Sequence, residues 1–502
     1  MYTNYSSPVS LIVFVLFCIG CSSMKNIQDV PAALRNDWIY FESSTTKIDS
    51  RKYAVDEGFI VVYENPADSS SRRIKLPVRR IRAADPKPSE PIFWFNGGPG
   101  MTNMKYDPPS ALLEKHDVVL VGYRGVDGST VLQSDIITKA VKGAGDDLFS
   151  TASMENISSA VGSFASDMRE QGIDLAQYSI VNVISDFEKV REAFGYEKIN
   201  LLSASYGTRV ALLYGYLHPD VLAHSVMFGA NPPGRFVFDP KTIDEQLRYY
   251  DRLYAESHHH EKDLSLVAMM KSVLVSLPAR WTIFKLDPGK IRVATFAMLY
   301  HKNTAAIVFD CYRAASEGDY SGMYALQLAY DFTLPSMMVW GDLLAKGASA
   351  DYDASFDYIA RLNDEETTLG SPLALLIWGG AAGSFPVALI PTELRSVQTS
   401  SVPTLIVSGS IDFSTPAEYA SRELLPSLPN GTQLILKEMG HINDLFSLQP
   451  EAVAHLLVQY FDEGIVDDSQ FIYDPMNFHP PIDVPLWTKV LYPFVAVASI
   501  FL

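Results

Sequence analysis

Short apolar runs alternate with amphipathic segments over the first half of the chain. The continuous apolar runs 92–95 and 118–121 are typical of strands that are buried on both faces of a sheet, and the run 199–202, which contains Asn200, predicts another strand. The segments 183–194 and 206–217, which flank the last of these runs, have apolar residues at helical spacing. Because strands that alternate with helices form a mostly parallel sheet covered on both faces, this pattern predicts an α/β fold.

Further strand-like segments lie on either side of this region. Segments 58–63 and 74–81 are separated by the polar stretch 66–72, which has the composition of a hairpin turn. A proline-rich link at 84–91 leads into the strand that follows, and 223–228 has the apolar character of another buried strand. The segment before residue 92 therefore predicts a β-hairpin that joins the same sheet.

The pattern changes between residues 233 and 397. Long helical patterns such as 242–257 and 264–275 replace the buried strands, and the strand pattern returns only at 404–407 and 433–436. We therefore expect an α/β core interrupted by a large helical cap. The expected order is a signal peptide (1–20), a tether (21–36), the first part of the core (37–232), the helical cap (233–397), the second part of the core (398–475) and a C-terminal tail (476–502).

The N-terminal segment predicts export. Residues 11–20 form an apolar run that is too short to span a bilayer and suits a signal peptide. The run ends in Cys18-Ile-Gly-Cys21, which resembles the lipobox of bacterial lipoproteins, although Cys18 stands where leucine is usual and no Lys or Arg precedes the run. We expect Cys21 to carry a lipid that holds the exported protein at a bacterial membrane, at the outer membrane or the periplasmic face. An ordinary cleaved signal or a short anchor is the alternative.

Composition narrows the class of protein. The 502 residues are 48% apolar and 20% charged, as in globular proteins, and the net charge of −18 argues against a nucleic-acid partner. Cysteines occur only at Cys18, Cys21 and Cys311. If the first is removed and the second lipidated, no intrachain disulfide is possible, and Cys311 is expected to be a small buried residue.

The strongest local motif is Ser203-Ala-Ser-Tyr-Gly207, between a predicted strand and a predicted helix. Its spacing is that of a nucleophile elbow, in which the central serine occupies a sharp, strained turn. The residues two before and two after the serine must be small so that the strand and the helix can approach each other. Ser203 replaces the usual first glycine, and Gly207 fits. The motif predicts Ser205 as a nucleophile.

A glycine-rich loop follows the predicted strand 92–95. Acyl transfer needs backbone N–H groups where the carbonyl oxygen becomes an oxyanion, and glycine lets the backbone come close. We expect the N–H groups of Gly98 and Tyr206 to form the oxyanion hole. The remaining residues of the motif are expected to support it: Asn96, Gly97, Pro99 and Gly100.

Two late strands each end in a residue that the nucleophile would need. Asp412 follows the strand that begins at Thr404, and His441 follows the next strand. The order Ser, Asp, His is that of the α/β-hydrolase triad, in which histidine is the base and the acid orients it. Glu438 and Asp444 are second choices for the acid, because neither ends the preceding strand.

A metal centre is not expected. The run His258-His-His260 is interpreted as a solvated stretch that closes a cap helix. Consecutive histidines do not face one site on a helix, and no acidic or cysteine partner has metal-ligand spacing.

These motifs together resemble the proline iminopeptidase and tripeptidyl aminopeptidase family of serine peptidases. Asn96-Gly-Gly-Pro-Gly100 is similar to that family's His-Gly-Gly-Pro-Gly loop, with Asn in place of His. The segments 121–129 and 185–195 also resemble the family, as do Ser205-Tyr-Gly-Thr208 and Asp412-Phe-Ser-Thr-Pro416. The resemblance implies an aminopeptidase-like hydrolase that needs no cofactor and whose substrate enters beneath a helical cap. The first loop is also similar to that of serine carboxypeptidases.

Substrate choice is less determined by the sequence. The resemblance implies that acidic cap residues hold the amino terminus of a short peptide, and Asp239, Asp244 and Glu245 are candidates that no fixed motif aligns. Exposed helix charges are the simpler interpretation of each. An esterase or lipase-type enzyme with the same triad, acting on small esters, and a non-catalytic surface binding protein on the same scaffold are the alternatives. The oligomeric state stays open, as does the role of the apolar segment 490–502.

Overall fold

The computed structural model describes residues 39–144, 147–257 and 265–501, with only the backbone described from residue 493 onward. The predicted signal peptide, the whole predicted tether with Cys21, and the run 258–260 lie outside the described residues. The predictions for these segments therefore stay predictions.

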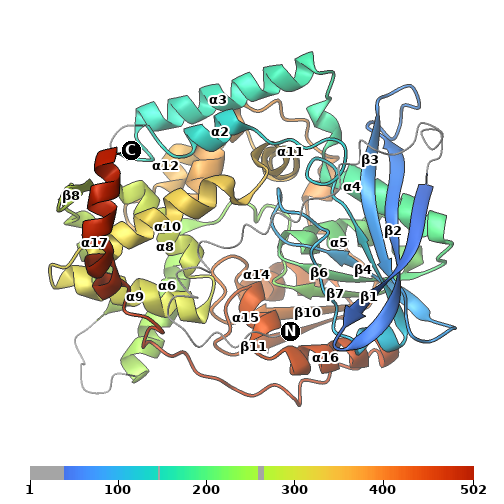
Figure 1. Cartoon of the computed structure of the whole chain (residues 1–502). Helices are drawn as coiled ribbons and strands as arrows, with labels where there is room; N and C mark the ends of the chain where they lie inside the picture. Colours follow the sequence, from blue (N-terminus) through green and yellow to red (C-terminus); the bar gives the residue numbers. More distant parts are fainter. Residues whose placement is uncertain (1–38, 145–146, 258–264, 502) are drawn as a thin grey trace.

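A nine-stranded sheet forms the centre of the core (Figure 1). The first three strands pair antiparallel, and β3 also pairs antiparallel with β5, whereas all pairs from β5 to β11 are parallel. This is the predicted α/β-hydrolase architecture. In spatial order the strands are β1 (Ile39–Ile48), β2 (Arg51–Tyr63), β3 (Arg73–Ile81), β5 (His116–Val121), β4 (Ser89–Phe95), β6 (Ile199–Ala204), β7 (Leu222–Phe228), β10 (Thr404–Gly409) and β11 (Gly431–Leu436).

Alternate side chains of the central strands belong to two separate hydrophobic clusters, one on each face of the sheet. Phe93 and Phe95 of β4 pack with the helices α4 (Ile180–Phe194) and α5 (Tyr206–Leu217). Trp94, which points the other way, packs with α16 (Pro450–Glu463). Because strand side chains alternate between faces, a continuous apolar run is what a sheet covered on both faces requires.

The N-terminal hairpin is longer than the sequence pattern indicated. β2 and β3 pair over nine residues, from Val55 with Ile81 to Tyr63 with Arg73. β1 was not predicted, because most of its side chains are exposed and several are Ser or Thr. It pairs with β2 along its whole length, so backbone hydrogen bonds rather than apolar burial hold this edge strand.

The segment expected to form the cap is helical and builds its own hydrophobic cluster. α2 (Asp135–Ala140) and α3 (Thr151–Glu170) join this cluster, although they precede the nucleophile strand and fall in the segment expected to belong to the core. A short exposed hairpin, β8 (Arg280–Trp281) with β9 (Phe284–Lys285), adds no buried strand. The cap helices are α6 (Pro240–Ser257), α7 (Leu266–Val275), α8 (Pro288–Met298), α9 (Lys302–Ser316), α10 (Ser321–Met337), α11 (Trp340–Asp351), α12 (Tyr358–Leu362) and α13 (Pro372–Ala374).

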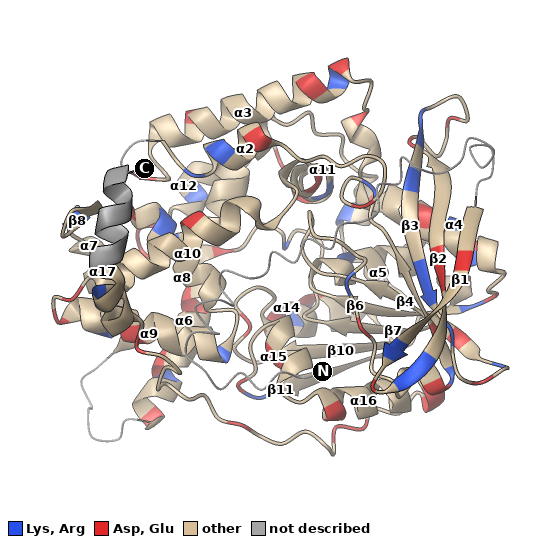
Figure 2. Ribbon diagram, in the orientation of Figure 1, with Lys and Arg blue, Asp and Glu red and all other residues tan. Residues whose placement is uncertain are grey.

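The C-terminal helix α17 (Val484–Phe501) lies against the cap. The Ser321 hydroxyl donates to the Pro485 carbonyl at 3.1 Å, and Lys489 pairs with Asp319 at 2.7 Å. Within the part of the chain that the structure describes, none of the helices combines the length and the apolar character needed to cross a membrane. Acidic and basic residues are interspersed over the cap helices and the N-terminal strands (Figure 2).

Candidate active site

Ser205 occupies a strained turn between β6 and α5. Its backbone has φ 50° and ψ −121°, a conformation that residues other than glycine rarely adopt. A Cβ at Gly207 would lie 2.2 Å from the Phe95 carbonyl oxygen, so only glycine lets α5 approach β4 this closely. Ser203 is buried and donates a hydrogen bond to the Val226 carbonyl at 3.0 Å, which explains how serine replaces the usual glycine.

The structure brings Ser205, His441 and Asp412 into one chain of contacts. The Nε2 atom of His441 is 3.0 Å from the Ser205 Oγ, and its Nδ1 atom is 2.8 Å from an Asp412 carboxylate oxygen. These three residues follow β6, β11 and β10. The arrangement can transfer a proton from the serine hydroxyl to the imidazole while the carboxylate orients the ring.

Asp412 is fully buried and is held as an ionised acceptor. Burial raises the pKa of the Asp412 carboxyl, but the charge of a protonated His441 and its hydrogen bond lower it, with bonds from Thr415, and the net pKa lies below its usual value. The N–H groups of Ser414 and Thr415 donate to Oδ1, each at 2.8 Å, and the Thr415 hydroxyl donates to Oδ2 at 2.8 Å. Sequence reasoning did not single out Thr415, although its position three residues after a strand-end acid is a usable signal.

The two second-choice acids have other partners. Glu438 accepts hydrogen bonds from the Tyr473 hydroxyl and from the Met476 N–H at 2.6 Å. Asp444 accepts the N–H groups of Gly440 at 2.9 Å and Lys302 at 3.0 Å. Glu438 therefore holds the segment at Tyr473 and Met476, Asp444 holds the loop at Gly440, and the His441 ring is instead bonded to Asp412.

The glycine-rich loop lies directly against Ser205. A Cβ at Gly97 would be 2.9 Å from the Ser205 Cβ. The Gly97 N–H donates to the Asn96 side chain at 2.9 Å, and Gly98 has φ +67°, so the chain turns sharply where the oxyanion donor is expected. Tyr206 is the first residue of α5, where a backbone N–H has no acceptor within the helix. Both predicted donors thus belong to segments that adjoin Ser205.

Two further residues of the loop have structural roles. The Asn96 side-chain amide donates to the Thr102 carbonyl at 2.8 Å and so closes the loop on itself. Gly100 follows Pro99 and has φ +88°. It lies against the cap, because a Cβ at this position would be 2.8 Å from the Val339 carbonyl oxygen.

The predicted cap acids do not meet at the triad. Asp239 accepts the N–H groups of Lys241 and Thr242 at the start of α6. Asp244 pairs with Arg248 at 2.7 Å and accepts the Thr368 N–H at 2.9 Å, while Glu245 is exposed. Asp239 and Glu245 are exposed, as the simpler interpretation expected, whereas Asp244 is buried and holds the backbone at Thr368.

A cap residue that sequence reasoning missed touches the catalytic loop. The His441 N–H donates to the Tyr300 carbonyl at 2.6 Å, and the two rings lie edge to face with their centres 5.3 Å apart. Burial raises the pKa of the Tyr300 hydroxyl, so the side chain is neutral at physiological pH. No local motif marks Tyr300, because its contact depends on how the cap packs on the core.

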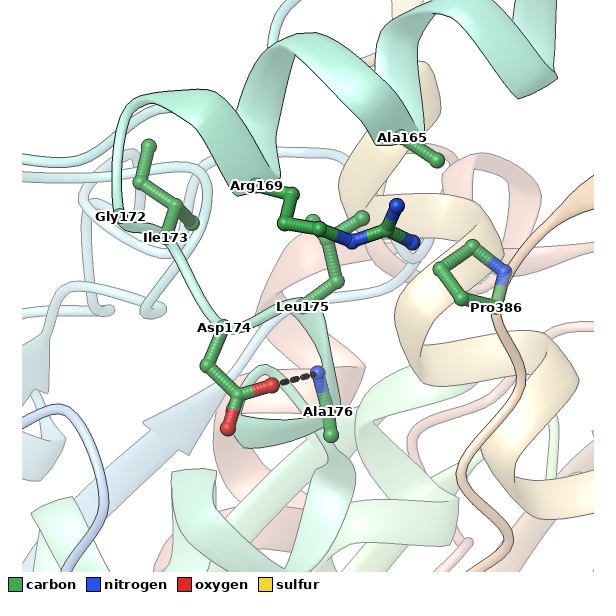
Figure 3. Close-up of a pocket in the computed structure, with 8 residues that line it drawn as sticks. All are labelled: Ala165, Arg169, Gly172, Ile173, Asp174, Leu175, Ala176 and Pro386. Carbon is green, nitrogen blue, oxygen red and sulfur yellow. Dashed lines mark hydrogen bonds between the residues drawn. The ribbon is translucent and has the colours of Figure 1, made fainter.

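The cavity in Figure 3 lies away from these residues, beside the end of α3. It has a volume of roughly 400 Å³, and Arg169 and Asp174 are its charged residues. Asp174 is engaged by the Ala176 N–H at 3.1 Å (Figure 3). Among the described residues, no cluster of three or more His, Cys, Asp or Glu side chains could hold a metal ion.

Comparison with known proteins places the fold in a family. Solved structures similar to this chain include a serine hydrolase from Cycloclasticus zankles, with 13% identity over 85% of this chain and 100% of that chain (TM-score 0.36). They also include esterases from Thermogutta terrifontis (14% identity, 81% and 98% coverage, TM-score 0.35) and Exiguobacterium antarcticum (15%, 78% and 96%, 0.35). No curated protein matches the sequence. Residues 90–446, well over half of the chain, match the α/β hydrolase fold family, and the chain belongs to that family.

Proposed function

We propose that the protein is a serine hydrolase in which Ser205 is the nucleophile, His441 the general base and acid, and Asp412 the residue that orients the imidazole. One observation carries the proposal. Contacts of 3.0 and 2.8 Å connect the Ser205 hydroxyl, through both ring nitrogens of His441, to a buried carboxylate. Membership of the α/β hydrolase fold family supports hydrolysis as the reaction class.

The reaction proceeds in two acyl transfers. The Ser205 oxygen attacks the substrate carbonyl carbon while His441 Nε2 takes the hydroxyl proton, and the leaving amine then receives that proton as the scissile bond breaks. A water molecule attacks the resulting ester, gives its proton to His441, and the proton returns to Ser205 as the acid product leaves. Asp412 keeps the imidazole in the required tautomer throughout.

The oxyanion of each tetrahedral intermediate is bound by the N–H groups of Gly98 and Tyr206. Donors of this kind are worth about 3–4 kcal/mol each in other serine hydrolases, because they are already oriented before the charge develops. Their positions beside Ser205, on the loop after β4 and at the start of α5, support this assignment.

The proposed substrate is a short peptide cleaved near its amino terminus. Support comes from the similarity of the loops at Asn96–Gly100 and Ser205–Thr208 to those of the proline iminopeptidase and tripeptidyl aminopeptidase family. The placement of a large helical cap over the strand ends agrees with a substrate that enters beneath it. Small esters are the competing substrate class.

Hydrolysis assays with matched substrates test this proposal. We expect purified protein to hydrolyse fluorogenic aminoacyl and peptidyl amides and the Ser205→Ala variant to be at least about 1,000-fold slower. A fluorophosphonate probe should label only the wild type. Ester cleavage without amide cleavage would assign the protein to the esterases. Absence of labelling and of both activities would indicate a binding protein instead.

Membrane attachment through Cys21 is a separate proposal that rests on the sequence alone. A lipidated protein should appear in the membrane fraction of the cells that express it and carry a radiolabelled fatty acid. The Cys21→Ala variant should lose the label. A wild type without fatty acid would favour an ordinary cleaved signal.

A further inference from the structure

The cap helix α11 reaches the loop that carries the proposed oxyanion donor. The Gly100 N–H donates to an Asp342 carboxylate oxygen at 3.0 Å, and the Gly100 carbonyl accepts the Val339 N–H at 2.9 Å. Both backbone groups of this one glycine are therefore bound by the first turn of α11 and the residue before it. Gly100 is only two residues from Gly98, and Figure 1 shows α11 between the cap helices and the sheet.

Asp342 is itself held by Lys346, one helical turn later. The two side chains form an ion pair, and both are fully buried. The Lys346 ammonium also donates to the Arg124 carbonyl at 2.9 Å, in the segment that follows β5. The pair thus links two neighbouring loops at the same edge of the sheet, one after β4 and one after β5.

The other end of the glycine-rich loop is held from the segment after β5. The Tyr123 hydroxyl donates to the Asn96 carbonyl at 3.1 Å, and the Tyr123 ring lies 5.4 Å from the Lys346 ammonium. Asn96 and Gly100 are the first and last residues of the loop. Gly97 and Gly98 therefore lie between two fixed residues. Tyr123, which contacts Lys346, binds Asn96, and Asp342, which pairs with Lys346, binds Gly100.

Stability alone does not account for a buried ion pair at this place. Burial raises the pKa of Asp342 to about 6 and lowers that of Lys346, which reflects the cost of removing both charges from water. Apolar residues of similar size are often equally or more stabilising. A carboxylate is, however, a stronger acceptor for a backbone N–H than a neutral group. An oxyanion donor works only if it is held in place before the reaction, so a strong, rigid acceptor has a use here.

We propose that Asp342, held by Lys346, is a positioning residue that keeps the loop of Gly97 and Gly98 against Ser205, so that the cap completes the oxyanion-binding loop. This inference rests on the proposed serine hydrolase function. It makes the cap a part of the catalytic apparatus as well as a cover for the substrate. Asp342 contacts neither the nucleophile nor the imidazole and acts only through the loop.

The test compares Asp342→Asn with a matched variant at the other end of the same helix. Asp351 also forms a fully buried ion pair, with Arg209 at 3.0 Å, but it binds the N–H groups of Gly234 and Phe236 instead of Gly100. We expect Asp342→Asn to lower kcat by about 10- to 100-fold with KM nearly unchanged, because a loop shift of a fraction of an ångström weakens transition-state binding. Asp351→Asn should keep kcat within about threefold of the wild type.

Two measurements separate positioning from folding. A boronic acid, which forms a tetrahedral adduct with the serine, should lose affinity for the Asp342→Asn variant in proportion to kcat/KM, while the affinity for a product stays the same. The double variant Asp342→Asn with Lys346→Met has no unpaired buried charge, so it should melt near the wild-type temperature and still be slow. Thermal melting checks that every variant is folded.

These experiments distinguish failure of the proposed role of Asp342 from failure of the proposed serine hydrolase function. Equal losses of kcat in Asp342→Asn and Asp351→Asn, or unchanged boronic acid affinity in the former, would overturn the inference while leaving the serine hydrolase assignment intact. A double variant that regains wild-type kcat would also overturn it. A wild type that no fluorophosphonate labels would instead remove the proposed function, and the inference with it.

Discussion

The core and the cap both contribute to the candidate site, but in different ways. The core supplies Ser205, Asp412 and His441, which lie in the segments that follow β6, β10 and β11. The cap supplies the Tyr300 carbonyl and the Asp342 carboxylate, which bind backbone N–H groups of core loops. In this comparison the proposed reacting groups come from loops after strands, whereas the Tyr300 and Asp342 groups that bind these loops come from the cap.

The cap therefore contacts the site from two sides. Tyr300 binds the backbone of His441, and Asp342 binds that of Gly100. A cap attached in this way is expected to move little relative to the catalytic loops during turnover. Experiments at four residues test whether the core and the cap have these different roles.

The largest effect is expected in the core, at Asp412. Asp412→Asn should lower kcat by about 1,000- to 10,000-fold, because an amide no longer selects the tautomer of His441 that accepts the serine proton. Hydrolysis of a fluorogenic substrate, with thermal melting to verify folding, measures the loss. Glu438→Gln is the matched control and should retain near-wild-type kcat, since Glu438 binds Tyr473 and Met476. A greater loss in the control would assign the orienting role to Glu438.

A smaller effect is expected where the cap meets the loop of His441. Asp444→Ala removes the shared acceptor of the Gly440 and Lys302 N–H groups. We expect kcat to fall by about 10-fold and the free energy of unfolding by about 2 kcal/mol, because two buried donors lose their partner. Denaturant titration and steady-state kinetics check the two numbers. Unchanged kcat despite the lost stability would show that the cap is not needed to place this loop.

Far from the cap, a buried carboxylate should affect stability without affecting activity. Burial raises the pKa of Asp56, but hydrogen bonds from Arg82, Ser43 and Arg80 outweigh this and hold the pKa well below its usual value. The carboxylate therefore contributes stability above about pH 4 and loses it as the pH falls further. Asp56→Asn should cost about 2–3 kcal/mol at pH 7, with kcat within about twofold.

Unfolding titrations between pH 7 and pH 3 measure this second contrast. The difference in stability between the wild type and Asp56→Asn should shrink as the pH falls below about 4, because the Asp56 carboxyl of the unfolded chain takes up a proton there while that of the folded protein stays ionised. A constant difference over the whole range would contradict the pKa that the three donors imply.

The smallest effect is expected at Cys311 in the cap. The thiol is fully buried and free, and burial raises its pKa well above the usual value. Iodoacetamide should leave the Cys311 peptide unmodified in the native protein and alkylate it in urea, as read by peptide mass spectrometry. Cys311→Ala should retain wild-type kcat. Alkylation in the native state would show that the cap opens around α9.

Sequence patterns predicted the strands whose side chains are buried on both faces, and they missed β1. Residues 92–95, 118–121 and 199–202 all lie in strands, because the first two are continuous apolar runs and the third is apolar apart from Asn200. β1 carries mostly exposed polar side chains and is held by pairing with β2. The sequence also did not indicate that α3 packs with the cap cluster, because helix periodicity shows which face is buried but not its partner.

Local sequence patterns predicted the sharp turn at Ser205 and the chain order of serine, aspartate and histidine after the strands β6, β10 and β11. These features depend on short local patterns of small, apolar and polar residues. Only the tertiary structure decided which cap groups support the site. The contact of Gly100 with Asp342 joins residues 242 positions apart, and its existence depends on how two hydrophobic clusters pack together, which no local pattern encodes.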